Sequence, residues 1–168
     1  MEADGDEIVT YRDAMIPKKI PKSLLVVGSG AIGIEFASFY NDMGVDVTVV
    51  EAMDRILNVE DREISDIAHK SFEKRGIKIY TSATLESISK SKNGVTSTII
   101  IGGKKQKIST EKIIMAIGII GNTENLGLEA IGVKIEKGHV VTDGFGATNI
   151  KGIYAIGDVT GPPWLAHK

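Results

Sequence analysis

Three closely spaced glycines, at positions 28, 30 and 33, constrain the fold of this chain more than any other feature. They follow an apolar stretch, residues 24–27, which is too short for a buried helix and therefore predicts a buried strand. Apolar residues then recur at helical spacing as far as Gly44, where a helix would end. Residues 46–50 predict a second strand, and Glu51 follows it directly. The segment thus has the order strand, glycine-rich turn, helix, strand and acid.

This order is the structural context that a dinucleotide-binding fingerprint requires. Gly28 would allow a tight turn after the strand, Gly30 would let a pyrophosphate approach the backbone, and Gly33 would let the helix pack closely on the strand. The first helical amides, with about half a positive charge, would face the phosphates. The apolar residues that would form the buried face of this helix are Ile32, Phe36, Phe39, Tyr40 and Met43.

Glu51 favours NAD over NADP. Its carboxylate would accept hydrogen bonds from the adenosine ribose, whereas a 2′-phosphate about 4 Å away would cost about 1 kcal/mol in water and about 4 kcal/mol at an effective dielectric constant of 20. Arg55 is the nearby residue that could neutralise such a phosphate, but Asp54 precedes it. Two alternatives are a glycine-rich turn that binds nothing and a methyltransferase-type turn that binds S-adenosylmethionine.

The next segments predict the rest of an α/β sheet. Asp61 or Glu60 can cap a helix that runs to about Arg75, and residues 77–80 predict a third strand. The apolar stripe of this helix comprises Ile64, Ile67, Ala68 and Phe72. Right-handed crossovers would make the sheet parallel.

The pattern then changes to strands without helices. Residues 84–90, 95–101 and 104–110 alternate or are β-branched, and Asn93-Gly94 is a strong hairpin signal. They predict a three-stranded antiparallel meander, followed by a buried strand over residues 112–117. The predicted fold class is therefore α/β, a Rossmann-like NAD-binding domain whose parallel sheet carries helices and has a meander as one crossover.

The predicted domains are a lead-in segment over residues 1–22, an NAD-binding domain over 23–147 and a return segment over 148–168. Within the second range, residues 127–141 predict a loop and hairpin. In the last range, an apolar strand is expected to end at Gly157 and Asp158, where a carboxylate could meet a ligand hydroxyl. A buried strand followed by an ordinary Asp turn is the alternative.

Composition narrows the function classes. A net charge of −2 gives no basic excess for nucleic acid, and no apolar run reaches the ~20 residues that would span a membrane. The chain has no cysteine, which fits a reducing compartment, and its three histidines are scattered without metal-ligand spacing. We expect no metal site, and we expect a bacterial cytoplasmic or a mitochondrial matrix location.

Several motifs make the chain similar to the flavoprotein disulfide reductases, which bind two dinucleotides, and most of all to the dihydrolipoyl dehydrogenases among them. The motifs are GSGAIGIE at 28–35, VVEAMDRIL at 49–57, MAIG at 115–118, NLGLE at 125–129, GIYAIGDV at 152–159 and LAHK at 165–168. Two positions depart from the family pattern: GIIGN stands at 118–122 in place of Gly-Arg-x-Pro-Asn, and Asn58 stands where proline is common.

The resemblance implies roles for individual residues. The NAD pyrophosphate would be held by Gly28, Ser29, Gly30, Ala31, Ile32, Gly33, Ile34 and Glu35, with Glu35 reaching towards the nicotinamide. Glu51 would hold the adenosine ribose, and Leu85 and Gly118 would line the NAD cleft. Asp158 would bond the ribityl side of FAD, with Trp164, Leu165, Ala166 and His167 beside it.

The resemblance also implies an activity. The parent enzyme, a homodimer within 2-oxo acid dehydrogenase complexes, would oxidise dihydrolipoamide through a disulfide and FAD and pass hydride to NAD⁺. The redox cysteines and the His-Glu base of the family have no match here, so this chain is expected to bind NAD(H) as a monomer without turnover and to contain no catalytic residue. The alternatives are the NAD domain of another NADH-linked flavoprotein, such as an NADH oxidase or a mercuric-type reductase, and a non-enzymatic NAD-binding module.

Overall fold

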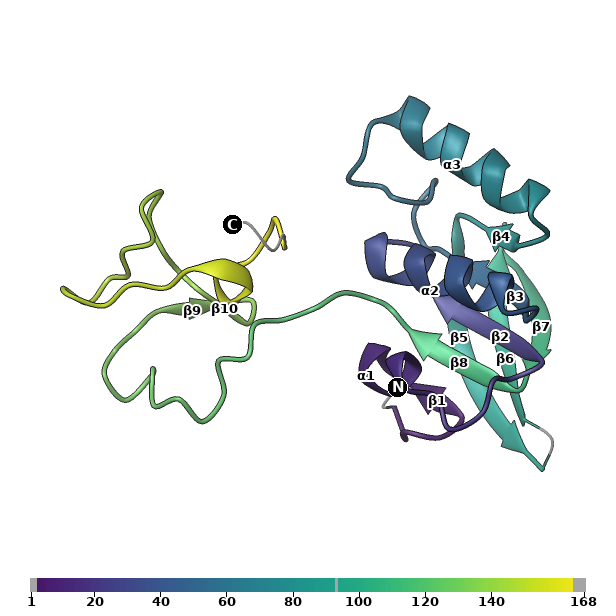
Figure 1. Ribbon diagram of the computed structural model, residues 1–168, viewed down its shortest axis with the longest axis horizontal. Coiled ribbons are helices and arrows are strands. Elements are labelled where there is room, and N and C mark those ends of the chain that lie inside the picture. The colour runs from purple at the N-terminus through teal and green to yellow at the C-terminus, as the bar shows by residue number, and fades with distance from the viewer. Residues whose placement is uncertain (1–2, 93, 165–168) are drawn as a thin grey trace. The chain divides into compact units, whose positions relative to one another are not determined.

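The computed structural model describes residues 3–92 and 94–164 (Figure 1). The chain divides into two compact units, one ending at Gly118 and the other beginning at Ile119. Residues 119–147, which the sequence analysis grouped with the NAD-binding domain, belong to the second unit. Each unit is described by itself.

The first unit is built on a five-stranded parallel sheet with the strand order β1-β8-β2-β3-β4. The strands are β1 (Ile8–Val9), β2 (Ser23–Val27), β3 (Asp46–Val50), β4 (Lys78–Tyr80) and β8 (Lys112–Met115). In the register, Val27 pairs with both Val50 and Met115. The three central strands therefore end together, so Gly28, Glu51 and Ala116 emerge at the same edge of the sheet.

The parallel sheet is covered on both faces, as its continuous apolar strands require. Leu24 and Val26 belong to a core cluster with Ala37 and Tyr40 of a helix. Leu25 and Val27 face the other way and pack with Ile99 and other residues of the antiparallel sheet. Helices therefore cover one face and a second sheet covers the other (Figure 1).

The helices are α1 (Tyr11–Met15), α2 (Ala31–Asp42) and α3 (Arg62–Lys74). The second sheet is the predicted antiparallel meander, with strands β5 (Ala83–Ser91), β6 (Gly94–Ile101) and β7 (Lys104–Thr110). The predicted fold class is confirmed in both respects, the parallel sheet with helices and the meander between β4 and β8.

The predicted buried face of α2 is wrong in part. The buried residues are Gly33, Ile34, Ala37 and Tyr40, whereas Phe39 and Met43 are 50% and 53% exposed. The physical reason is close packing at Gly33: once the helix touches the strand-turn backbone there, Ala37 and Tyr40, one and two turns later, point to the sheet.

The predicted stripe of α3 is also wrong in part. Ile64 and Ile67 are 54% and 59% exposed, and Ser65 is fully buried instead. Its hydroxyl donates a 3.1 Å hydrogen bond to the carbonyl of Leu57. This contact with the preceding loop fixes the rotation of the helix, because a buried hydroxyl needs a partner.

One strand was not predicted, and one predicted strand is absent. The lead-in contains β1, which pairs in parallel with β8, because the exposed edge of β8 offers a ladder that the sequence alone does not reveal. The strand expected before Asp158 does not form. In the second unit, the paired strands among the described residues are the short hairpin β9 (Ile135–Glu136) and β10 (His139–Val140), beside one bridge between Ala147 and Tyr154.

The apolar residues before Asp158 do not form the predicted strand because a strand needs a neighbouring strand to complete its backbone hydrogen bonds. Gly157–Thr160 forms a 3₁₀ helix. From residue 3 to 92 and from 94 to 164, we find no helix with the length and apolar character to cross a bilayer.

Candidate dinucleotide-binding site

The glycine-rich turn joins β2 to α2 in very little space. Gly28 has a φ of 97°, and a Cβ on it would lie 2.4 Å from the carbonyl oxygen of Ala116. A Cβ on Gly33 would lie 2.0 Å from the carbonyl oxygen of Gly28. Both distances are far below van der Waals contact, so a side chain at either position would force the backbone to shift. The sequence assigned both glycines to the turn and the packing, but it did not single out Ala116, the small residue at the end of β8 against which they pack.

Gly30 differs from its two neighbours. It is the N-cap of α2, has an ordinary φ of −64°, and a Cβ on it would meet no atom within 4 Å. No side chain caps the helix, whose first amides are those of Ala31, Ile32 and Gly33. A pyrophosphate fits this cradle, since the absent Cβ leaves room for it and the first amides of a helix attract anions.

Glu51 stands at the same edge of the sheet and is held by its backbone on both sides. Its N–H donates to the carbonyl of Tyr80 at 2.8 Å, and its carbonyl accepts from the N–H of Ala83 at 2.9 Å. Its carboxylate accepts three more hydrogen bonds: from the N–H and the hydroxyl of Ser29 at Oε2, both 2.7 Å, and from the N–H of Met53 at Oε1, 2.8 Å. The structure therefore brings Glu51 to the glycine-rich turn, 22 residues earlier in the chain.

The loop after Glu51 is tied to the same turn. The N–H of Leu57 donates to the carbonyl of Ser29 at 2.9 Å. The guanidinium of Arg55 contacts the carbonyl of Asn58 at 2.9 Å and the carboxylate of Asp54 at 3.4 Å. A hydrogen bond from Arg62 holds the pKa of the Asp54 carboxyl below its ordinary value. Arg55 is thus engaged within its own loop, beside an anionic Asp54.

The other predicted residues fall into two groups. In the first unit, Glu35 is exposed on α2, Ile34 is buried in the core, Leu85 is partly buried beside the meander core, and Gly118 has a φ of 120° with open space at its Cβ position. Through its side chain, Ile34 therefore supports the fold, and only its backbone could meet a ligand.

The remaining predicted residues lie in the second unit. Asp158 is exposed in the 3₁₀ helix, and Trp164, 41% exposed, packs its ring 5.8 Å from that of His139. The predictions for Leu165, Ala166 and His167 lie outside the described residues. Within the part of the chain that the structure describes, no three His, Asp or Glu residues gather in a group that could hold a metal ion.

Comparison with known proteins identifies the family. The model of the pyridine nucleotide-disulphide oxidoreductase family matches residues 2–168. Dihydrolipoyl dehydrogenases from Rhizobium etli and Zymomonas mobilis are 58% and 47% identical over the whole chain, which spans 35% and 36% of their lengths.

Solved structures agree. LpdA from Mycobacterium tuberculosis matches with a TM-score of 0.86 and 35% identity over 99% of this chain and 36% of its own. The flavoprotein disulfide reductase RclA from Escherichia coli matches with a TM-score of 0.85 and 28% identity over 99% of this chain and 37% of its own. The resemblance drawn from the motifs is thereby confirmed, and the chain, which spans about a third of the length of these relatives, belongs to the pyridine nucleotide-disulphide oxidoreductase family.

Proposed function

We propose that this chain is the NAD(H)-binding part of a dihydrolipoyl dehydrogenase. One observation carries the proposal: the carboxylate of Glu51 is fixed beside a glycine-rich turn whose middle glycine, Gly30, faces open space. If the turn served only for packing, Gly28 and Gly33 would be explained, but the carboxylate of Glu51 held beside the turn would not be. A dinucleotide explains both, because its pyrophosphate and its adenosine ribose lie a short distance apart.

The residues would divide the work by chemistry. The backbone of residues 28–33 would hold the pyrophosphate, and Glu51 would accept a hydrogen bond from a ribose hydroxyl. By family resemblance, Glu35 would lie towards the nicotinamide, and Leu85 and Gly118 would line the cleft. Asp158 and residues 164–167 are proposed for the FAD side on resemblance alone.

The activity of the whole enzyme is part of the proposal. Bound NAD⁺ would supply the hydride acceptor when dihydrolipoamide is oxidised through a disulfide and FAD. This chain holds no cysteine, so its own contribution is binding and orientation, and we expect no turnover from it alone. The homodimer and the 2-oxo acid dehydrogenase complex are proposed from the same resemblance.

A second flavoprotein class shares the fold, since RclA aligns almost as well in space as LpdA does. Sequence identity favours the lipoamide enzyme: it is 58% to the Rhizobium etli dihydrolipoyl dehydrogenase and 28% to RclA. The NAD-binding role is common to both readings.

Titration of the purified protein with NADH, followed by nucleotide fluorescence, tests the proposal. Glu51→Arg is expected to weaken NADH binding at least about tenfold, because it removes an anionic acceptor and turns a cation onto the donors of Ser29 and Met53. Glu73→Arg, the same charge reversal at an exposed position in the last turn of α3, is the control and should bind as the wild type does. A wild-type protein that gives no response to NADH, or equal binding by both variants, would contradict the proposal.

A further inference from the structure

The backbone N–H, the hydroxyl and the carbonyl of Ser29 all form hydrogen bonds with other residues of the protein. It is 1% exposed, its N–H and its hydroxyl both donate to Oε2 of Glu51, and its carbonyl accepts from Leu57. Its side chain therefore points to the carboxylate rather than into the open space beside Gly30. A serine placed in a phosphate-binding turn would ordinarily be assigned to the phosphate, and here its geometry assigns it to the neighbouring acid.

The acceptor positions of the carboxylate show what this arrangement leaves for a ligand. An ionised carboxylate offers about four acceptor positions, two on each oxygen. Ser29 takes both positions on Oε2, and the N–H of Met53 takes one on Oε1. One position remains, and it belongs to Oε1.

From this count we infer that Ser29 is a positioning residue for the nucleotide: it locks Oε2 of Glu51, so that Oε1 receives one hydroxyl of the adenosine ribose. The inference rests on the proposed function and adds to it the atom that binds and the residue that fixes it. Ser29 itself touches no part of the nucleotide through its side chain. It acts through Glu51, because two donors on one oxygen remove the freedom of the side chain to rotate about its last bond.

The hydroxyl matters beyond the backbone N–H. Hydrogen bonds to a charged acceptor are about twice as strong as neutral ones. Without the hydroxyl, Oε2 keeps a single donor, and the carboxylate can turn and lose its alignment with the sugar. Glycine or alanine at position 29 would leave the turn intact and loosen the acid.

A double-mutant cycle with NADH as the probe tests this role. In the wild-type background, Ser29→Ala is expected to weaken NADH binding by about three- to tenfold, the range of one hydrogen bond to a charged group in a partly exposed site. In the Glu51→Ala background, Ser29→Ala is expected to change NADH binding less than about twofold, because the group through which it acts is gone. Ser65→Ala is the matched control: Ser65 is equally buried and bonds the same loop at Leu57, but it does not contact Glu51.

The outcomes separate this inference from the proposed function. If wild-type protein binds NADH and Glu51→Ala weakens binding, but Ser29→Ala binds as the wild type does, the positioning role is wrong and the proposed function stands. Equal losses from Ser29→Ala in both backgrounds would show a purely structural serine, which also overturns the inference. A second variant is used if the thermal unfolding midpoint of Ser29→Ala falls well below that of Ser65→Ala. Ser29→Gly, which also keeps the backbone N–H donor, then replaces Ser29→Ala in the double-mutant cycle, and its NADH binding is judged by the same two outcomes.

Discussion

At the scale of single residues, the three glycines of the turn have three different physical roles. Gly28 and Gly33 are required by the protein itself, because a Cβ at either would overlap a backbone carbonyl. Gly30 is not required by the protein, since a Cβ there meets nothing within 4 Å and its φ suits any residue. On the proposed function, its lack of a side chain leaves room for the nucleotide phosphate.

This difference gives a paired prediction. Gly30→Ala should leave the thermal unfolding midpoint near that of the wild type and weaken NADH binding about tenfold or more, since its methyl group would occupy the phosphate position. Gly33→Ala should lower the free energy of unfolding by about 1–3 kcal/mol, the usual cost of overpacking. Calorimetry and fluorescence titration of the two variants check it, and a Gly30→Ala protein that binds NADH normally would contradict the cradle.

At the scale of elements, α3 depends on the residue that begins it. The sequence allowed either Glu60 or Asp61 as its cap. The structure selects Asp61, which has the extended backbone of an N-cap (φ −57°, ψ 142°) and accepts a 2.8 Å hydrogen bond from the N–H of Glu63. The choice follows from geometry, because only a short side chain at the N-cap reaches back to the first amides.

We therefore expect Asp61→Ala to reduce the free energy of unfolding by about 1 kcal/mol, the usual value of an N-cap. Glu60→Ala, one residue earlier, should change it by less than about 0.5 kcal/mol, as is normal for an exposed position. Denaturant titrations of the two variants, compared with the wild type, decide between the two caps. A larger loss from Glu60→Ala would mean that the helix begins elsewhere.

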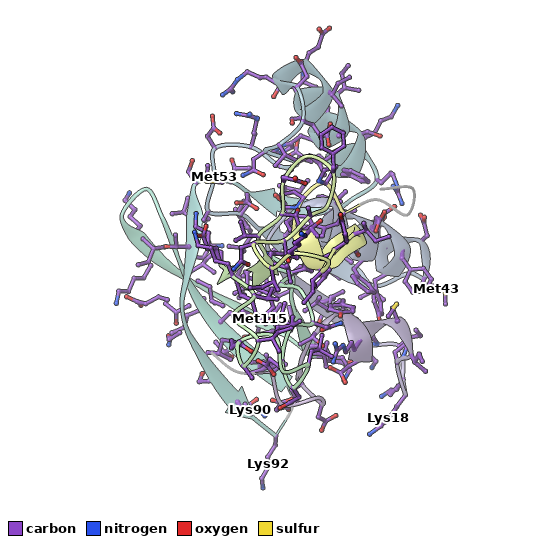
Figure 2. All side chains as sticks on the ribbon, turned by 90° about the vertical axis from the view of Figure 1, so that its left-hand side faces the viewer. Lys18, Met43, Met53, Lys90, Lys92 and Met115 are labelled. Atoms are coloured by element: carbon purple, nitrogen blue, oxygen red, sulfur yellow. The ribbon has the colours of Figure 1, made fainter. Side chains whose placement is uncertain are left out.

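At the scale of the whole molecule, the N-terminal segment is tied to the tip of the meander, far from it in sequence. Lys90 of β5 forms a salt bridge with Asp4 and lies 3.5 Å from the carboxylate of Glu7. The Asp4 carboxylate also accepts the N–H groups of Asp6, Glu7 and Ile8. Figure 2 shows Lys90 and Lys92 near the bottom of the view and Met53, which lies two residues after Glu51, in its upper part. This tie joins the segment before β1 to β5 of the meander.

The tie should depend on pH. Burial raises the pKa of Asp4, but the hydrogen bond from Lys90 and those from the backbone outweigh it and lower the pKa from 3.8 to about 2. Because the pKa is lower in the folded state, the stabilisation is complete above pH 3.8 and is lost as the pH falls towards about 2.

Asp4→Asn should therefore lower the thermal unfolding midpoint at pH 6, and the difference from wild type should disappear near pH 2. NADH binding by this variant at pH 7 should equal that of the wild type, which serves as the control. A difference in midpoint that persists at the acid end would show that the charge of Asp4 is not its cause.

The sequence alone predicted the features that rest on local chemistry. The strand before Gly28, the meander around Gly94 and the existence of α3 follow from apolar runs and turn residues, all readable within about ten positions. The glycine spacing and Glu51 likewise indicated one site, because strand order and turn geometry bring the two together whatever covers them. The family resemblance drawn from these motifs was confirmed by the family model and by the similar proteins.

Only the tertiary structure decided which surfaces meet. Phe39 and Met43 have the spacing of a buried face and remain exposed, because Gly33 and Ala37 set the rotation of α2 against the sheet. Ile8 and Val9 become a strand because they pair with the edge of β8 that β2 leaves open. Among the described residues, the apolar run before Asp158 has a single bridge, from Tyr154 to Ala147, and forms no strand. Ser29 meets Glu51 because two neighbouring parallel strands end at the same level, a contact across 22 residues that depends on register, which no pattern within either segment contains.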